Sequence, residues 1–222
     1  HERDHGPQES PRSLGHFGKT SLGRDYLNPF LLGGEQVIIT SSSDPTLAVG
    51  KILFANVQDV EKAVAVVDRY YTEGPLADGE FFVRSLQLLN AAMIMYARRK
   101  ELSALIMYEA GKSLREAYGD VDEAIDFLNF YAREEARLQS LPYPHHSRGP
   151  VAVIAQWNFP LAIPCGMVSS SLVSGNPVIL KSAEQTPLIA QALVDILHEA
   201  GVPQEALIHL PGLGEVVGEA LV

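Results

Sequence analysis

The chain has 222 residues and a formal net charge of −10 at pH 7, with 46% hydrophobic and 20% charged residues. This length allows one large domain or most of two, and the acidic balance disfavours nucleic acid or an anionic membrane surface as the main partner. The single cysteine, Cys165, excludes an intramolecular disulfide and a site built from several thiolates, and no apolar run is long enough for a transmembrane helix. These features suit a reducing compartment, so we expect a cytoplasmic protein, or one of the mitochondrial matrix in a eukaryote.

The first part of the chain predicts an arm followed by short strands. Residues 1–28 are polar, contain Gly and Pro, and lack the apolar segment of a secretory signal peptide. Short apolar runs at 30–33, 36–40 and 49–55 are separated by turn residues, which predicts a small antiparallel β-meander.

Helical periodicity follows as far as residue 139. Asp59 is a suitable cap for the first helix, which Gly74 and Pro75 should end. Ser113 is a suitable cap for a later helix. The remaining helices are expected at 82–98, at 101–110 and at 121–139.

The sequence pattern changes after residue 148, where predicted strands and helices alternate. The run at 151–155 is apolar and β-branched, which predicts a strand buried on both faces. Further strands are expected at 177–180 and 206–210, and helices at 160–174, 187–200 and from Glu215 onward. This βαβαβα order predicts a Rossmann-like parallel sheet in an α/β fold, with parts at 1–28, 29–148 and 149–222.

Asn158 follows the first of these strands, between Trp157 and Phe159. A side-chain amide there, beside the positive end of the next helix, suits the stabilisation of a developing oxyanion. Asn is also a favoured helix cap before a proline, and by spacing alone the cap is the commoner role. Both roles therefore stay open for Asn158.

The ends of the next two strands carry a charge pair and glycines. Lys181 and Glu184 could hold a ribose diol, although a solvated charge pair is the commoner role of such residues. Gly214 and Gly218 would let a flat ring or a phosphate approach the backbone, but their spacing departs from the dinucleotide fingerprint. Because the carboxyl ends of parallel strands lie on one edge, the three signals together predict a dinucleotide crevice.

Several segments, in the same order, resemble the signature segments of the aldehyde dehydrogenase superfamily. The resemblance extends over about residues 30–222, and two upstream segments resemble one branch in particular. That branch is the Δ1-pyrroline-5-carboxylate (L-glutamate γ-semialdehyde) dehydrogenases, free-standing or within proline utilization A proteins. The superfamily segments are 149–160, 175–187, 199–203 and 211–214, and the branch segments are 108–112 and 120–128.

The resemblance implies NAD-dependent oxidation of an aldehyde to a carboxylate, with L-glutamate γ-semialdehyde as the expected substrate in proline catabolism. It implies that Asn158 donates its amide to the oxyanion of the reacting aldehyde. It also implies that Lys181 and Glu184 hold the adenosine ribose, which favours NAD because a carboxylate there disfavours the 2′-phosphate of NADP.

The resemblance also implies that four further residues contact the cofactor. Ala155 and Trp157 would border the nicotinamide, and Gly214 and Gly218 would lie beside the adenine and the pyrophosphate. The expected partners are a small aldehyde and further copies of the chain, in a dimer or a larger homo-oligomer.

The family mechanism needs a cysteine thiolate and a glutamate that members carry beyond the region matched here. Cys165 has apolar neighbours and no nearby cation to lower its pKa, so we expect a packed thiol. The histidines lack metal-ligand spacing, so we expect no metal site. The 222-residue chain is therefore expected to be an incomplete fold without activity of its own. The alternative is a non-catalytic aldehyde-dehydrogenase-like module for assembly or nucleotide binding.

Overall fold

A computed structural model describes residues 33–74, 81–142 and 146–222. The predicted arm and most of the predicted strand at 30–33 lie outside these residues. The strands are β1 (Glu35–Thr40), β2 (Ala48–Phe54), β3 (Val151–Ile154), β4 (Val178–Lys181) and β5 (Leu207–His209). The helices are α1 (Val57–Glu73), α2 (Phe81–Ala97), α3 (Arg99–Ala110), α4 (Leu114–Gln139), α5 (Ala162–Val173), α6 (Pro187–Glu199) and α7 (Glu219–Leu221).

The strands form two separate sheets. β1 and β2 pair antiparallel, while β3, β4 and β5 form a parallel sheet in that order. Parallel neighbours need a crossover, and here α5 and α6 supply it. The predicted α/β class, with an alternating unit after a strand pair and several helices, is confirmed.

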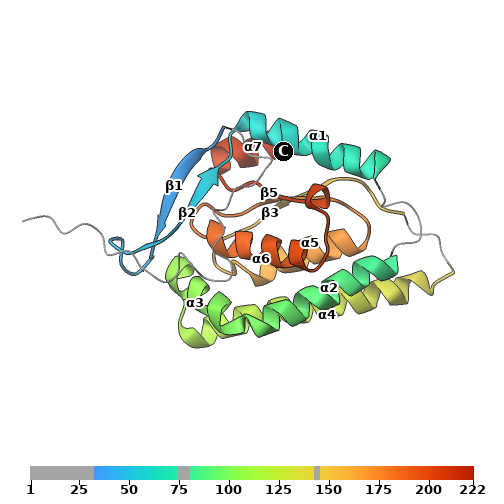
Figure 1. The fold of residues 1–222 in the computed structure, drawn as a ribbon, viewed down its shortest axis with the longest axis horizontal. Coiled ribbons are helices and arrows are strands. Elements are labelled where there is room, and N and C mark those ends of the chain that lie inside the picture. Colours follow the sequence, from blue (N-terminus) through green and yellow to red (C-terminus); the bar gives the residue numbers. More distant parts are fainter. Residues whose placement is uncertain (1–32, 75–80, 143–145) are drawn as a thin grey trace, which may run out of the picture.

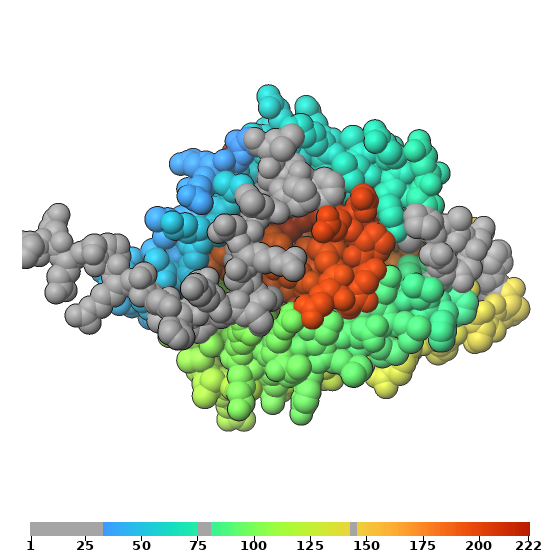
Figure 2. Space-filling model, in the orientation of Figure 1, coloured from blue at the N-terminus to red at the C-terminus, as the bar shows by residue number. Residues whose placement is uncertain are grey.

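The parallel sheet is the middle layer of the described structure (Figure 1). The side chains of β4 alternate between its two faces, so Val178 and Leu180 join one hydrophobic cluster and Ile179 joins another. Helix α1 covers the Ile179 face, while α5 and α6 cover the opposite face and pack in turn on α2, α3 and α4. On the face shown in Figure 2, the orange surface near α6 lies between the cyan α1 and the green α2 and α3.

Strand β3 departs from the prediction that it is buried on both faces. Val153 is buried, but Ala152 and Ile154 are exposed, with 47% of Ile154 open to solvent. The reason is its place at the edge of the sheet: the cluster between α1 and the sheet contains residues of β4 and β5 but none of β3.

Helix α1 begins earlier than predicted, because Asn56 and not Asp59 is its cap. The Asn56 side chain accepts from the Asp59 amide at 3.0 Å, and the Asp59 carboxylate accepts from the Asn56 amide at 3.1 Å. This reciprocal pair is a capping box, in which the predicted cap is the third helical residue. The predicted end at Gly74 is confirmed.

Helix α4 joins what the sequence predicted as two helices. Ser113 caps it as predicted, with a capping box to Glu116, but the helix then runs without a break through Gly119 and Asp120. The Asp120 side chain is fully buried and its carboxylate accepts from the Lys112 ammonium at 2.8 Å. This tertiary contact outweighs the weak helix propensity of the Gly-Asp pair.

Helix α5 begins at Ala162 and not at Pro160, so residues 156–161 form an irregular segment, called here the 156–161 loop. The α5 and α6 helices are followed by Gly175 and Gly201, whose φ values of 81° and 106° favour glycine and confirm the predicted stops. Among the described helices, none combines the length and apolar character that a membrane crossing needs.

Candidate functional site

The carboxyl ends of β3, β4 and β5 lie along one edge of the parallel sheet, because the three strands are parallel neighbours. Backbone hydrogen bonds tie these ends together just beyond the strands. The Ala155 amide donates to the Lys181 carbonyl at 2.9 Å, and the Leu210 amide donates to the Leu180 carbonyl at 2.8 Å. The segments that follow each strand are therefore fixed side by side, in the order in which a crevice ligand would meet them.

Asn158 lies in the exposed part of the 156–161 loop, at the β3 end of this edge. Its neighbours Trp157 and Phe159 are 55% and 41% exposed. The cap interpretation of Asn158 is wrong, because α5 begins four residues later and its first amide, that of Ala162, donates to Asp120 instead. Within the described residues no hydrogen bond engages the Asn158 side chain, so its amide is available to a ligand.

Lys181 and Glu184 lie at the β4 end, where they form an ion pair with 3.1 Å between Nζ and the carboxylate. The Lys181 side chain is only 5% exposed, against 36% for Glu184, so the pair is not a fully solvated one, which is the commoner role of such residues. A buried ammonium needs a partner, and Glu184 is that partner. Partial burial raises the pKa of Glu184, but its own backbone amide and Lys181 outweigh this, so the net shift is downward. Glu184 is thus held as a partly exposed anion.

Gly214 and Gly218 lie beyond β5, in a turn of π-helix at Gly214–Gly218 that precedes α7. A Cβ atom added at either position would meet no atom within 4 Å among the described residues. Gly212 is different, because a Cβ there would lie 2.6 Å from the Val217 side chain. The backbone at Gly214 and Gly218 therefore borders open space.

The predicted site residues thus lie along one edge of the sheet, beside the ends of β3, β4 and β5. Lys181 contacts Glu184 directly and Ala155 through its backbone. No described contact joins Asn158 to this pair or to the two glycines. Ala155 is 8% exposed, so it contributes backbone and a small side chain, while Trp157 presents its ring to solvent.

A buried histidine behind this edge was not predicted to be part of the site. His209 ends β5, and its ring nitrogens bond to the Gln191 side chain at 2.8 Å and to the Ser182 hydroxyl at 2.9 Å. Burial lowers the pKa of His209 to about 3, so the ring is neutral. It links the ends of β4 and β5 to α6. The signal in the sequence was a polar residue ending an apolar strand, beside Leu210.

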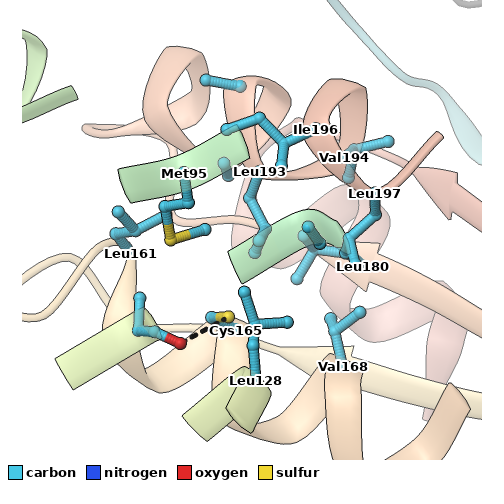
Figure 3. Close-up of a cluster of buried hydrophobic side chains, with 14 of the residues drawn as sticks. Met95, Leu128, Leu161, Cys165, Val168, Leu180, Leu193, Val194, Ile196 and Leu197 are labelled. Atoms are coloured by element: carbon cyan, nitrogen blue, oxygen red, sulfur yellow. Dashed lines mark hydrogen bonds between the residues drawn. The ribbon is translucent and has the colours of Figure 1, made fainter. Parts of the chain in front are cut away.

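Cys165 is fully buried in the main hydrophobic cluster, among Leu128, Leu161 and Val168 (Figure 3). Its thiol lies 3.5 Å from the Ala124 carbonyl, as the dashed line shows. Burial raises the pKa of the thiol, and the nearby Asp120 raises it further. Such a group is a poor nucleophile, in agreement with the sequence prediction. Across the described residues, no group of three or more His, Cys, Asp or Glu side chains could hold a metal ion.

The chain is similar to a known protein family over most of its length. A model described as the aldehyde dehydrogenase family matches residues 36–222. The 1-pyrroline-5-carboxylate dehydrogenase of Geobacillus kaustophilus (strain HTA426) is 38% identical over an alignment that covers 92% of this chain and 42% of that protein. The same enzyme of Geobacillus sp. (strain WCH70) is 37% identical with the same coverage, so the chain spans about two fifths of these relatives.

Solved structures of the same group of enzymes are similar to this chain in sequence and fold. Proline utilization A from Bdellovibrio bacteriovorus, inactivated by N-propargylglycine, has 39% identity and a TM-score of 0.80, over 86% of this chain and 21% of that one. The 1-pyrroline-5-carboxylate dehydrogenase from Thermus with bound NAD has 37% identity and a TM-score of 0.77, over 84% of this chain and 38% of that one.

Proposed function

Because this chain belongs to the aldehyde dehydrogenase family, we propose that its protein oxidises an aldehyde to a carboxylate with NAD as the hydride acceptor. The observation that carries the proposal is the edge of the parallel sheet. There a side-chain amide without a described partner, a partly exposed carboxylate paired with a buried lysine, and glycines beside open space lie at three consecutive strand ends. A relative that is similar in fold over 84% of this chain holds NAD.

The proposed substrate is L-glutamate γ-semialdehyde, which would be oxidised to glutamate in proline catabolism. Support comes from the relatives, since those at 37–38% identity are 1-pyrroline-5-carboxylate dehydrogenases. The exposed apolar side chains on α2 are consistent with a homo-oligomer, and they are Phe82, Val83, Leu86, Met93 and Tyr96.

In this proposal Asn158 donates its side-chain N–H to the oxygen that becomes negatively charged when the aldehyde is attacked. The donor is preorganised on a loop between β3 and α5, so it need not leave another partner first. Ala155 and Trp157 border the nicotinamide from the same loop. NAD supplies the chemistry of hydride acceptance when it is bound.

The ribose of the cofactor is assigned to Lys181 and Glu184. The Glu184 carboxylate accepts from the ribose hydroxyls, and Lys181 holds that carboxylate in place while donating to the same sugar. An anion at this position disfavours a 2′-phosphate, so NAD is preferred over NADP. Gly214 and Gly218 let the adenine and the pyrophosphate approach the backbone.

The nucleophile is the part that these 222 residues do not supply. Their single cysteine is buried and its thiol is held protonated, so it cannot attack an aldehyde in the crevice. We therefore propose that the 222-residue chain alone is inactive and that activity belongs to the longer protein.

The test is NADH formation from L-glutamate γ-semialdehyde, followed by absorbance. We expect NADH from the complete dehydrogenase that contains this chain, a weaker reaction with NADP, and none from the 222-residue chain. If the complete protein forms no NADH while it still binds NAD, the non-catalytic nucleotide-binding module is the correct function. NADH formation by the 222-residue chain would show that the assignment of Cys165 is wrong.

A further inference from the structure

A buried ion pair lies directly behind the 156–161 loop. The Lys112 ammonium lies 2.8 Å from the Asp120 carboxylate, and the two side chains are 14% and 0% exposed. Lys112 belongs to the short link between α3 and α4, and Asp120 lies in the second turn of α4. Two charges removed from solvent are costly to desolvate, and such a pair adds little net stability by itself.

Lys112 contacts the loop that carries Asn158, and Asp120 contacts the first residue of α5, directly after that loop. The second oxygen of Asp120 accepts from the Ala162 amide at 2.7 Å, which fixes the point where the loop enters α5. The Lys112 ammonium lies 3.9 Å from the centre of the Phe159 ring, within the range of a cation–π contact. Phe159 is the residue next to Asn158.

The loop has few other restraints at its exposed end. At its start the Ala155 amide is bound to β4, and at its end Leu161 is fully buried. Between these points Trp157, Asn158 and Phe159 are exposed, and within the described residues the contact of Lys112 with the Phe159 ring is the polar contact that reaches their side chains.

We propose that Lys112 and Asp120 are positioning residues that hold the 156–161 loop, and with it the Asn158 amide, at the carboxyl end of β3. The proposal rests on the proposed function for the chemical role of Asn158, and on the contacts above for its mechanism. Asp120 anchors the loop where α5 begins, and it also holds Lys112 against the ring next to Asn158. The pair therefore acts on the reaction through the loop and touches neither substrate nor cofactor.

The chain contains its own probe for this loop, because Trp157 is its single tryptophan. Intrinsic fluorescence of the 222-residue chain therefore reports on the residue beside Asn158 without any need for catalysis. The readouts are acrylamide quenching and fluorescence anisotropy, with circular dichroism to show that the helices are retained. The variants are K112M, F159L and their double variant, and F82L is the matched control on the exposed start of α2.

We expect K112M to raise the quenching constant of Trp157 and to lower its anisotropy, while F82L leaves the quenching constant unchanged. Because Lys112 acts through the Phe159 ring, K112M should add nothing once F159L is present, which is the signature of a coupled pair. K112R keeps a cation over the ring and should restore the wild-type signal. An unchanged Trp157 signal in K112M, or effects of K112M and F159L that simply add, would overturn the proposal.

K112M leaves Asp120 buried without its counter-charge, so it can unfold the chain. In that case the neutral pair K112M/D120N takes its place, since Asn keeps the oxygen that accepts from Ala162. A folded K112M/D120N variant with the wild-type Trp157 signal would likewise overturn the proposal.

The complete dehydrogenase gives the catalytic readout. K112M should lower kcat by about tenfold or more, but by less than the roughly 10²–10³-fold expected for loss of an oxyanion donor, and K112R should recover most of it. The KM for NAD should not change, because the ribose pair is on β4. If the complete protein oxidises no aldehyde, the proposed function fails, while the Trp157 measurements still decide whether the pair positions the loop.

Discussion

Replacement of Glu109 by Ala should remove a large part of the stability of the chain. Glu109 lies near the end of α3, is 3% exposed, and its two carboxyl oxygens accept from the first amides of α6. The distances are 2.8 Å to the Leu188 amide and 2.7 Å to the Ile189 amide. Thr186, the residue before α6, makes no side-chain cap, so Glu109 caps this helix from a distant part of the chain.

The loss in free energy of unfolding can be estimated from the two backbone amides that E109A leaves without an acceptor. Both amides belong to buried residues, so water cannot replace the Glu109 carboxyl group, and a buried donor without a partner costs about 1–3 kcal/mol. Two of them cost about 2–6 kcal/mol, which is a large fraction of the roughly 5–15 kcal/mol that stabilises an ordinary domain. E109Q should lose less, because its amide oxygen still accepts from one donor.

Urea unfolding followed by circular dichroism measures the effect. The same substitution at the exposed Glu123 of α4 is the control, and it should change the free energy of unfolding by about 0.5 kcal/mol or less. A loss below about 1 kcal/mol for E109A, with an unchanged denaturant slope, would refute the reasoning that these two bonds hold α6.

Three further outcomes are expected from the described contacts. Burial raises the pKa of Glu109 from 4.5 to about 8, so between these values the folded chain holds a proton that the unfolded chain has released. The free energy of unfolding should therefore fall as pH rises through this window, and E109Q should flatten the slope; an equal slope in both would contradict this. Cys165 should react with a disulfide reagent only on unfolding, and rapid labelling of the native chain would contradict its burial. Finally, Gly212→Ala should cost about 1–3 kcal/mol because its Cβ would press on Val217, while Gly214→Ala should leave Tm unchanged.

Much of the fold could be predicted from local signals. The glycines at 111, 175 and 201 end helices in the structure as predicted, because their positive φ values are conformations that other residues avoid. The run of apolar residues at 178–180 is buried on both faces because β4 is the central strand. The similar run at 151–154 is not, since edge position depends on the packing of α1 and not on the run itself.

The errors share a physical cause, which is that tertiary contacts outweigh local preferences. Asp120 stays within α4 because it is buried against Lys112 and the start of α5, 42 residues further along the chain. Glu109 caps α6 across 79 residues. Such pairings cannot be inferred from spacing. The division of the chain at residue 148 stays a prediction, and one hydrophobic cluster includes residues from both sides of it.

In the candidate site, too, the features that depend on tertiary contacts could not be predicted from the sequence. Lys181 and Glu184 were predicted by their place after a strand, but the burial of Lys181 was not, because it depends on the neighbouring strands. For Asn158 the sequence left a cap and an oxyanion donor open. The structure removes the cap, since α5 begins at Ala162, and leaves the donor as a proposal.

The most direct test of the central proposal is the effect of Asn158→Ala on aldehyde oxidation by a full-length protein that carries this chain. The measurement is the kcat for NADH formation from L-glutamate γ-semialdehyde, together with the Kd for NAD. The account predicts that kcat falls by about 10²–10³-fold, as for the loss of one oxyanion donor, while the Kd for NAD stays the same. An unchanged kcat, or a loss explained wholly by weaker NAD binding, would contradict it.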